Sequence, residues 1–195
     1  MISVIPLASA ETTVSIYTEK EVYNYGDFLV FTIEIPEIKE DFAILHIIDE
    51  SGLRSSAIPL SISDLKSVIP SSYAFEPEIY PEGKYKLELQ YSGELATAKF
   101  ELVDAGNIVI PFHIKEFSKY WYNGDTTDEG FMIVIQFLID EKMIEITQET
   151  SKEGNSVVIP KWFKIPTGWW IDGKVSDQEF AESVEFLINA GIFEV

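Results

Sequence analysis

The sequence predicts a protein of two parts, an N-terminal β-sandwich followed by two tandem helical hairpins. Up to residue 104, short apolar segments alternate with polar residues and are separated by turn sequences, as in sheets with one buried face. Beyond that point, residues 158–195 align without gaps on residues 109–146, 49 positions earlier, with 12 of 38 residues identical. Unrelated sequences of ordinary composition would share about two or three. The C-terminal half is therefore interpreted as a duplicated helical unit.

The N-terminal part is predicted to contain about seven short strands, a number typical of a β-sandwich. Residues 84–91 place tyrosine and leucine side chains on one face and charged or amide side chains on the other. After a turn at residues 92–94 the alternation returns in residues 96–102, so the two segments should form a hairpin. Further strands are expected at residues 28–35, 42–48 and 53–60.

Residues 23–30 (YNYGDFLV) and 83–87 (GKYKL) resemble segments of the immunoglobulin-like and macroglobulin-like domains of surface proteins. The resemblance implies an immunoglobulin-like β-sandwich over residues 11–104. The chain has no cysteine, so it lacks the disulfide that joins the two sheets of antibody domains. His46 lies in the middle of a predicted strand and is interpreted as structural, because no second histidine at ligand spacing accompanies it.

Each C-terminal repeat is predicted to form two helices. In the second repeat, Ser176 and Glu179 have the spacing of a capping box, and Gly191 can supply the left-handed residue that ends the helix. In the first repeat, Gly130 and Lys142 stand at the positions of that glutamate and that glycine. The first hairpin is therefore expected to be the less stable of the two.

The aromatic residues of the repeats divide into core and candidate surface positions. Trp170 matches a tryptophan of the first repeat and is expected in the core, and Pro166 predicts that the first helix of the second repeat is short, kinked or begins at this proline. Trp162, Trp169 and Tyr120 fall outside the apolar stripes and form a candidate interaction surface. The simpler alternative is that the two tryptophans fill the hairpin core.

The sequence favours a protein without metal or cofactor and without an active site. Residues 172–180 look like the second half of an EF-hand loop, but Gly168 and Trp170 would occupy two ligand positions of the first half, and Gly130 replaces the bidentate glutamate in the first repeat. No nucleophile elbow, phosphate-binding loop or dinucleotide motif is present. An enzyme remains the minor alternative.

Charge and termini restrict the partners. The net charge of -19 repels nucleic acid and anionic lipid, and no apolar segment is long enough for membrane insertion.

Residues 1–10 end in Ala8-Ser9-Ala10, a signal-peptidase pattern, so they are either the remnant of a signal peptide or an ordinary N-terminal arm. Residues 147–157 are polar and are expected to link the repeats.

The second repeat also contains a distinctive set of residues, which are Pro160, Trp162, Lys164, Trp169, Trp170, Gly173, Ser176, Asp177, Phe180, Leu187, Ile188 and Gly191. With these residues it resembles short repeats in predicted secreted and envelope proteins of ammonia-oxidising archaea. The resemblance implies an accessory module of a secreted or cell-envelope protein that mediates protein–protein or envelope attachment, with an envelope protein or glycan as partner. Carbohydrate binding through exposed tryptophans is the alternative.

Overall fold

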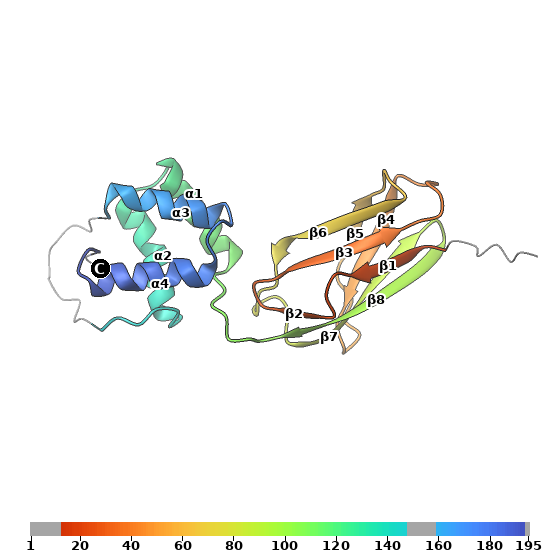
Figure 1. Ribbon diagram of the computed structural model, residues 1–195, viewed down its shortest axis with the longest axis horizontal. Helices are drawn as coiled ribbons and strands as arrows, with labels where there is room; N and C mark the ends of the chain where they lie inside the picture. Colours follow the sequence, from red (N-terminus) through yellow and green to blue (C-terminus); the bar gives the residue numbers. More distant parts are fainter. Residues whose placement is uncertain (1–12, 148–158, 194–195) are drawn as a thin grey trace, which may run out of the picture. The chain divides into compact units, whose positions relative to one another are not determined.

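The computed structural model describes residues 13–147 and 159–193. The expected signal remnant or arm at residues 1–10 and nearly all of the expected linker at residues 147–157 lie outside these residues. The chain divides into two compact units, Met1–Ala105 and Gly106–Val195. The first unit consists of strands and the second of helices (Figure 1).

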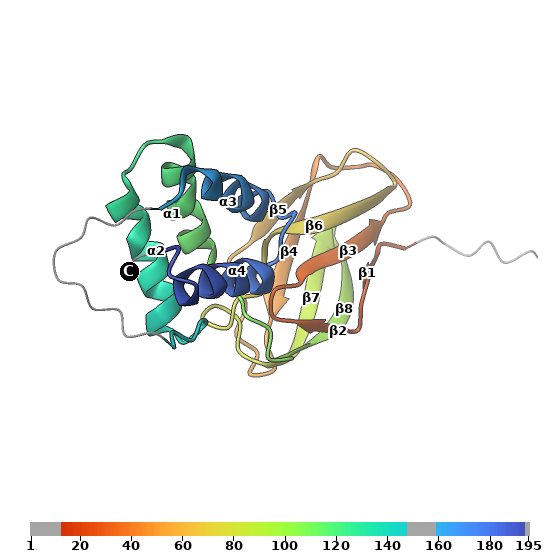
Figure 2. The same cartoon turned by 60° about the vertical axis from the view of Figure 1, so that its left-hand side comes forward.

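From residue 13 to its end, the N-terminal unit contains two β-sheets (Figures 1 and 2). One has three strands in the order β1-β3-β6, and the other has five in the order β2-β8-β7-β4-β5. Neighbouring strands are antiparallel, except that β2 runs parallel to β8. The strands are β1 (Ser15–Thr18), β2 (Val22–Asn24), β3 (Phe28–Glu34), β4 (Phe42–Ile48), β5 (Ile58–Ser61), β6 (Lys66–Ala74), β7 (Gly83–Tyr91) and β8 (Glu94–Val103).

The strand order is that of an immunoglobulin-like β-sandwich, so this prediction is confirmed. The chain changes sheets between β1, which pairs with β3, and β2, which pairs with β8. Near the start of β7 the Tyr85 hydroxyl donates to the carbonyl of Pro81 at 2.6 Å, the backbone link known as a tyrosine corner. Two residues later, where antibody domains have a cysteine, the side chain of Leu87 is fully buried. Apolar packing therefore replaces the disulfide.

The predicted hairpin is confirmed and extends over β7 and β8, with Tyr85 opposite Phe100 and Leu87 opposite Ala98. Its turn residues Ser92 and Gly93 both have positive φ, as a two-residue loop of type I′ requires. Every second side chain of β7 and β8 faces the other sheet. There the aromatic rings of Tyr23, Phe75, Tyr85 and Phe100 form the centre of the core.

The predicted strand at residues 53–60 is wrong in its first half, because β5 begins at Ile58. Before it, Arg54 forms an isolated bridge to Ile48. The Ser55 side chain accepts the backbone N–H of Ile47 at 3.0 Å, so a side chain replaces part of the expected ladder. His46 Nδ1 donates to the Ser55 carbonyl at 3.0 Å, which gives this histidine the structural contact expected of it.

Within residues 106–147 and 159–193, the C-terminal unit contains four α-helices and one short 3₁₀ helix. Helices α1 and α3 lie side by side, α1 also packs on α2, and α3 packs on α4 (Figures 1 and 2). Pro166 is the third residue of α3, within the first turn, where no backbone N–H is needed. The expected short helix is confirmed, although it begins two residues before the proline. The helices are α1 (Phe112–Asn123), α2 (Asp128–Asp140), η1 (Lys161–Phe163), α3 (Lys164–Ile171) and α4 (Asp177–Asn189).

The predicted ends of α4 are confirmed. Ser176 and Glu179 form the complete capping box, and Gly191 has the left-handed φ of 66°. After α2, Lys142 adopts a left-handed φ of 56°, which costs about 1–2 kcal/mol for a residue with a Cβ atom. The two halves thus end their second helices in the same way, with an unfavourable residue in the first half.

Candidate functional site

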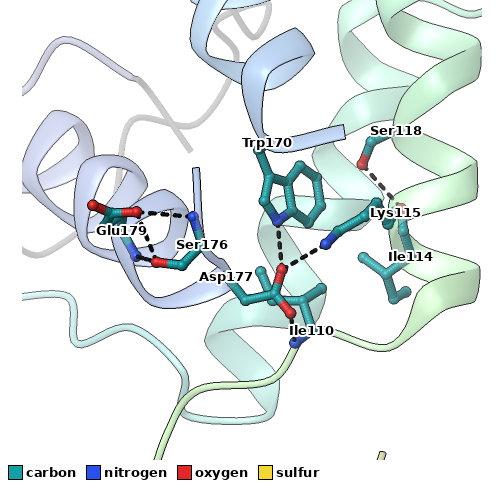
Figure 3. Close-up of polar contacts among 8 residues, drawn as sticks. All are labelled: Ile110, Ile114, Lys115, Ser118, Trp170, Ser176, Asp177 and Glu179. Carbon is teal, nitrogen blue, oxygen red and sulfur yellow. Dashed lines mark hydrogen bonds and ion pairs between the residues drawn. The ribbon is translucent and has the colours of Figure 1, made fainter. Parts of the chain in front are cut away.

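The second half of the helical unit is built around a buried indole. Trp170 stacks on Phe180 with 3.9 Å between ring centroids, and its Nε1 donates to Oδ1 of Asp177 at 2.6 Å. The same carboxylate accepts the backbone N–H of Ile110 at 2.9 Å and pairs with Lys115 at 2.8 Å (Figure 3). The Lys115 ammonium also lies 5.1 Å from the Trp170 ring centroid, within the range of a cation–π contact.

The first half has the corresponding contacts 49 residues earlier. Trp121 stacks on Phe131 with 4.2 Å between centroids, and its Nε1 donates to Oδ1 of Asp128 at 2.8 Å. Lys164, the counterpart of Lys115, lies 4.9 Å from the Trp121 ring centroid and donates to the Trp121 carbonyl at 2.7 Å. Each lysine therefore covers the tryptophan of the other half. Both indoles are core residues, as predicted, with exposed fractions of 1% or less.

The carboxylates of the loop that looks like half an EF-hand have partners within the protein. Asp172 pairs with Lys174 at 2.8 Å, and Glu179 accepts the backbone N–H of Ser176 at 2.8 Å. Hydrogen bonds from the backbone and side chain of Ser176 lower the pKa of Glu179. Within residues 13–147 and 159–193, no group of three or more His, Asp or Glu side chains could hold a metal ion.

Trp162 and Trp169 are each 50% exposed, so the alternative that they fill the hairpin core is wrong. Trp162 lies in η1 and Trp169 in α3. The adjacent residues Phe163 and Trp170 occupy the core with exposed fractions of 0%. Because successive residues of a helix point about 100° apart, burial of those two rings turns their neighbours toward the surface.

Trp162 and Trp169 share one side of the η1–α3 segment with Ile165, which is 55% exposed. The three residues are spaced i, i+3 and i+7, and such positions are neighbours on a helix surface. We call Trp162, Ile165 and Trp169 the aromatic strip. Both tryptophans were predicted as surface candidates from the sequence, whereas Ile165 was not, although its spacing from each of them was the available signal.

Tyr120, the third predicted surface residue, is 56% exposed but belongs to another part of the unit. It lies on α1, which meets α3 through the side that carries Tyr122. A Cβ atom on Gly168 of α3 would lie 2.6 Å from the Tyr122 ring, so the two helices approach closely there. Tyr120 is two residues from Tyr122, about 200° around the helix, and therefore points away from α3. The structure does not bring it to the aromatic strip.

The first half has a polar surface where the second has the aromatic strip. The residues 49 positions before the strip are His113, Glu116 and Tyr120 of α1. His113 and Tyr120 are exposed, and Glu116 is half-buried and paired with Lys119. We call His113, Glu116 and Tyr120 the polar flank. The two surfaces occupy corresponding places on corresponding helices and differ in chemistry.

No known family model matches the chain, and no curated protein matches it. In residues 13–147 and 159–193, no helix has both the length and the apolar character needed to cross a bilayer.

Solved structures that resemble the chain are immunoglobulin-domain proteins, and they match about half of it. The four N-terminal Ig domains of Dscam1 isoform 9.44 cover 47% of this chain at 18% identity with a TM-score of 0.28. The M1 domain from titin covers 50% at 11% identity with a TM-score of 0.27, and 94% of that domain is matched. The chain spans about a fifth of the Dscam1 structure. The immunoglobulin-like fold of the N-terminal unit follows from its strand order.

Proposed function

We propose that this protein is a non-enzymatic interaction protein and that its aromatic strip inserts into an apolar groove of a partner protein. The observation that carries the proposal is the exposure of Trp162, Ile165 and Trp169, which are 50%, 55% and 50% exposed on one side of the η1–α3 segment. Helices that bind in grooves present such anchors at i, i+3 and i+7. Tryptophan is also enriched among the residues that dominate binding energy at protein interfaces.

The strip is not required to complete the core of the helical unit. Phe163 and Trp170, which are neighbours of the two strip tryptophans in the chain, already occupy the interior and are fully buried. The corresponding polar flank on α1 indicates that the same helical packing tolerates polar side chains at these positions. Large apolar residues there expose surface to water without an internal partner, which is typical of a binding site.

A protein partner fits the strip better than a glycan does. Sugar sites combine aromatic rings with polar groups that bind hydroxyls. Ile165 lies between the two tryptophans along the helix, and its side chain has no hydrogen-bonding group. Carbohydrate binding through Trp162 and Trp169 is therefore kept as the alternative outcome of the experiment.

We also propose that the helical unit is a tandem duplication related to the repeats of archaeal secreted and envelope proteins, and that this protein is secreted or associated with the cell envelope. The support for duplication is the set of corresponding contacts of Trp121 and Trp170, with Lys164 and Lys115 exchanged between the halves. The support for location is the resemblance of the second repeat to that family. Attachment to an envelope protein is the function that follows.

Site-specific photo-crosslinking tests this proposal. Benzoylphenylalanine is placed at position 165 of the full-length chain, in the centre of the strip, and in a second variant at position 116, its counterpart in the polar flank. Both variants are irradiated with the envelope fraction of the source cells, and the adducts are identified by mass spectrometry. We expect one defined protein adduct from position 165 and none from position 116.

The control variant replaces the strip with the side chains of the polar flank, Trp162→His and Trp169→Tyr, in the chain that carries the crosslinker at 165. We expect loss of the adduct with a change in unfolding free energy below about 0.5 kcal/mol, because both tryptophans are half exposed. The same adducts from positions 165 and 116 would contradict the proposal. An adduct that consists of glycan would establish the alternative.

A further inference from the structure

The five-stranded sheet of the N-terminal unit presents positive charge in a protein with a net charge of -19. The side chains that alternate with buried Leu87 and Leu89 of β7 point away from the core, as do their register partners on β8. The acidic residues at these outward positions of β7 and β8 are Glu88 and Glu101. The cations, which we call the basic face, are Lys84 and Lys86 on β7, Lys99 on β8, and Arg54, which is bridged to β4.

Two lysines of the basic face oppose each other directly. Lys86 and Lys99 are register partners in the antiparallel pair of β7 and β8, which places their Cβ atoms about 5 Å apart. Like charges in this position destabilise a sheet. Within the described part of the chain, Lys99 forms no ion pair. An anion bound between the two ammonium groups would remove this repulsion.

Glu88 holds the other side of the basic face in place. Its carboxylate pairs with Lys86 at 3.1 Å and with the Arg54 guanidinium, and its side chain is only 15% exposed. The hydrogen bond from Lys86 and the charge of Arg54 lower the pKa of Glu88, so it stays ionised at neutral pH. The side chains of Arg54 and Lys86 remain 49% and 38% exposed. One carboxylate thus orders two cations that still face solvent.

We propose that the basic face binds a short acidic segment of a partner protein. From Lys99 across β7 and β4 to Arg54 the face extends about 14 Å, three strand spacings. Along β7 it is bounded near Gly83, where the Glu50 carboxylate lies close enough that a Cβ atom on the glycine would be 3.5 Å from its oxygens. A ligand with a few carboxylates therefore fits on the basic face, whereas a long polyanion would extend onto acidic surface and be repelled there.

Screening allows this local charge to act despite the opposite net charge. At physiological ionic strength the Debye length is about 8 Å, which is shorter than the basic face. An acidic side chain at the face therefore responds to Lys86, Lys99 and Arg54 more than to distant carboxylates. The inference concerns the β-sandwich and does not depend on the aromatic strip.

Fluorescence anisotropy with a fluorescein-labelled hexaglutamate peptide tests the proposal on the full-length chain at about 150 mM salt, where the Debye length is about 8 Å. We expect saturable binding that is about fivefold weaker in the Lys86→Gln, Lys99→Gln variant. The matched control, Lys39→Gln with Lys142→Gln, removes the same charge from exposed sites elsewhere and should change binding less than about twofold. In Glu88→Gln the carboxylate that competes for these cations is neutralised, so binding should tighten, a gain that misfolding cannot produce.

Three results would overturn the proposal. Absence of saturable binding by the wild-type protein would show that the face does not hold carboxylates. Equal weakening of peptide binding in the Lys86→Gln, Lys99→Gln variant and in the control variant would show that binding depends on net charge and not on the basic face. Tighter binding of dextran sulfate than of the peptide, lost in the Lys86→Gln, Lys99→Gln variant, would assign the face to an anionic glycan.

Discussion

The two halves of the helical unit share their buried contacts and differ on their surfaces. In each half a buried indole stacks on a phenylalanine and donates to an aspartate seven residues later, in the pairs Trp121–Asp128 and Trp170–Asp177. On the outside, the polar flank of α1 corresponds to the aromatic strip of η1 and α3. The buried contacts are the same in both halves, whereas the exposed residues at corresponding positions differ. The proposed binding is therefore assigned to the second half.

The strongest test of this comparison removes the two indoles one at a time. Trp121→Ala and Trp170→Ala should each lower the unfolding free energy of the helical unit by about 4 kcal/mol, since both side chains are buried. Chemical denaturation followed by circular dichroism at the helix band measures both variants. Costs that differ by more than about 2 kcal/mol would show that the two indoles do not have equivalent places in the core.

The two aspartates should differ in how much each contributes to the unfolding free energy, and this difference should be smaller than the cost of removing an indole. Asp177 binds Trp170 Nε1, the Ile110 amide and Lys115, whereas Asp128 accepts the indole N–H of Trp121. Asp177→Ala should therefore cost about 3 kcal/mol and Asp128→Ala about 1.5 kcal/mol.

Tryptophan fluorescence suits this measurement, because all four tryptophans of the chain belong to the helical unit. Lys115→Gln removes the ion pair with Asp177 and leaves the hydrogen bond from the Ile110 amide in place, so it measures the contribution of the lysine. Equal costs for the two aspartate variants would mean that the contacts of Lys115 and Ile110 add nothing.

The smallest expected difference concerns the caps of α2 and α4. Ser176→Ala should cost about 1 kcal/mol and Thr127→Ala somewhat less, because Thr127 lacks the reciprocal glutamate. The pKa of Glu179 is lowered from 4.5 by its hydrogen bonds with Ser176. Its stabilisation should therefore be complete above pH 4.5 and should disappear as the pH falls through the lower folded-state pKa.

Thermal unfolding of the wild type and Glu179→Gln at pH 7 and at pH about 3 checks the direction of this effect. The wild type should be the more stable protein at pH 7, and the two should converge in acid. A wild-type advantage that is unchanged in acid would exclude the ionised capping box as its source.

The sequence was sufficient where local chemistry decides the structure. Alternation placed Leu87 and Leu89 in the core, and cap residues located both ends of α4. The strand predicted from the sequence at residues 53–60 was wrong in its first half, because the hydrogen bond between the Ser55 side chain and the Ile47 amide depends on two segments meeting in space. A side-chain contact of this kind leaves no periodic pattern.

The candidate surfaces show the same division. Residue types and spacing alone identified Trp162 and Trp169 as candidates and Trp170 as core, because a repeated tryptophan marks the shared interior. The exposure of the first two, the separation of Tyr120 from them, and the crossing of Lys115 and Lys164 were decided by how α1 packs on α3. The opposition of Lys86 and Lys99 likewise depends on strand register. Sequence thus determined the helices, the strands with clear alternation and the apolar side of each, whereas packing and register, which join residues distant in the chain, decided what each surface presents to solvent.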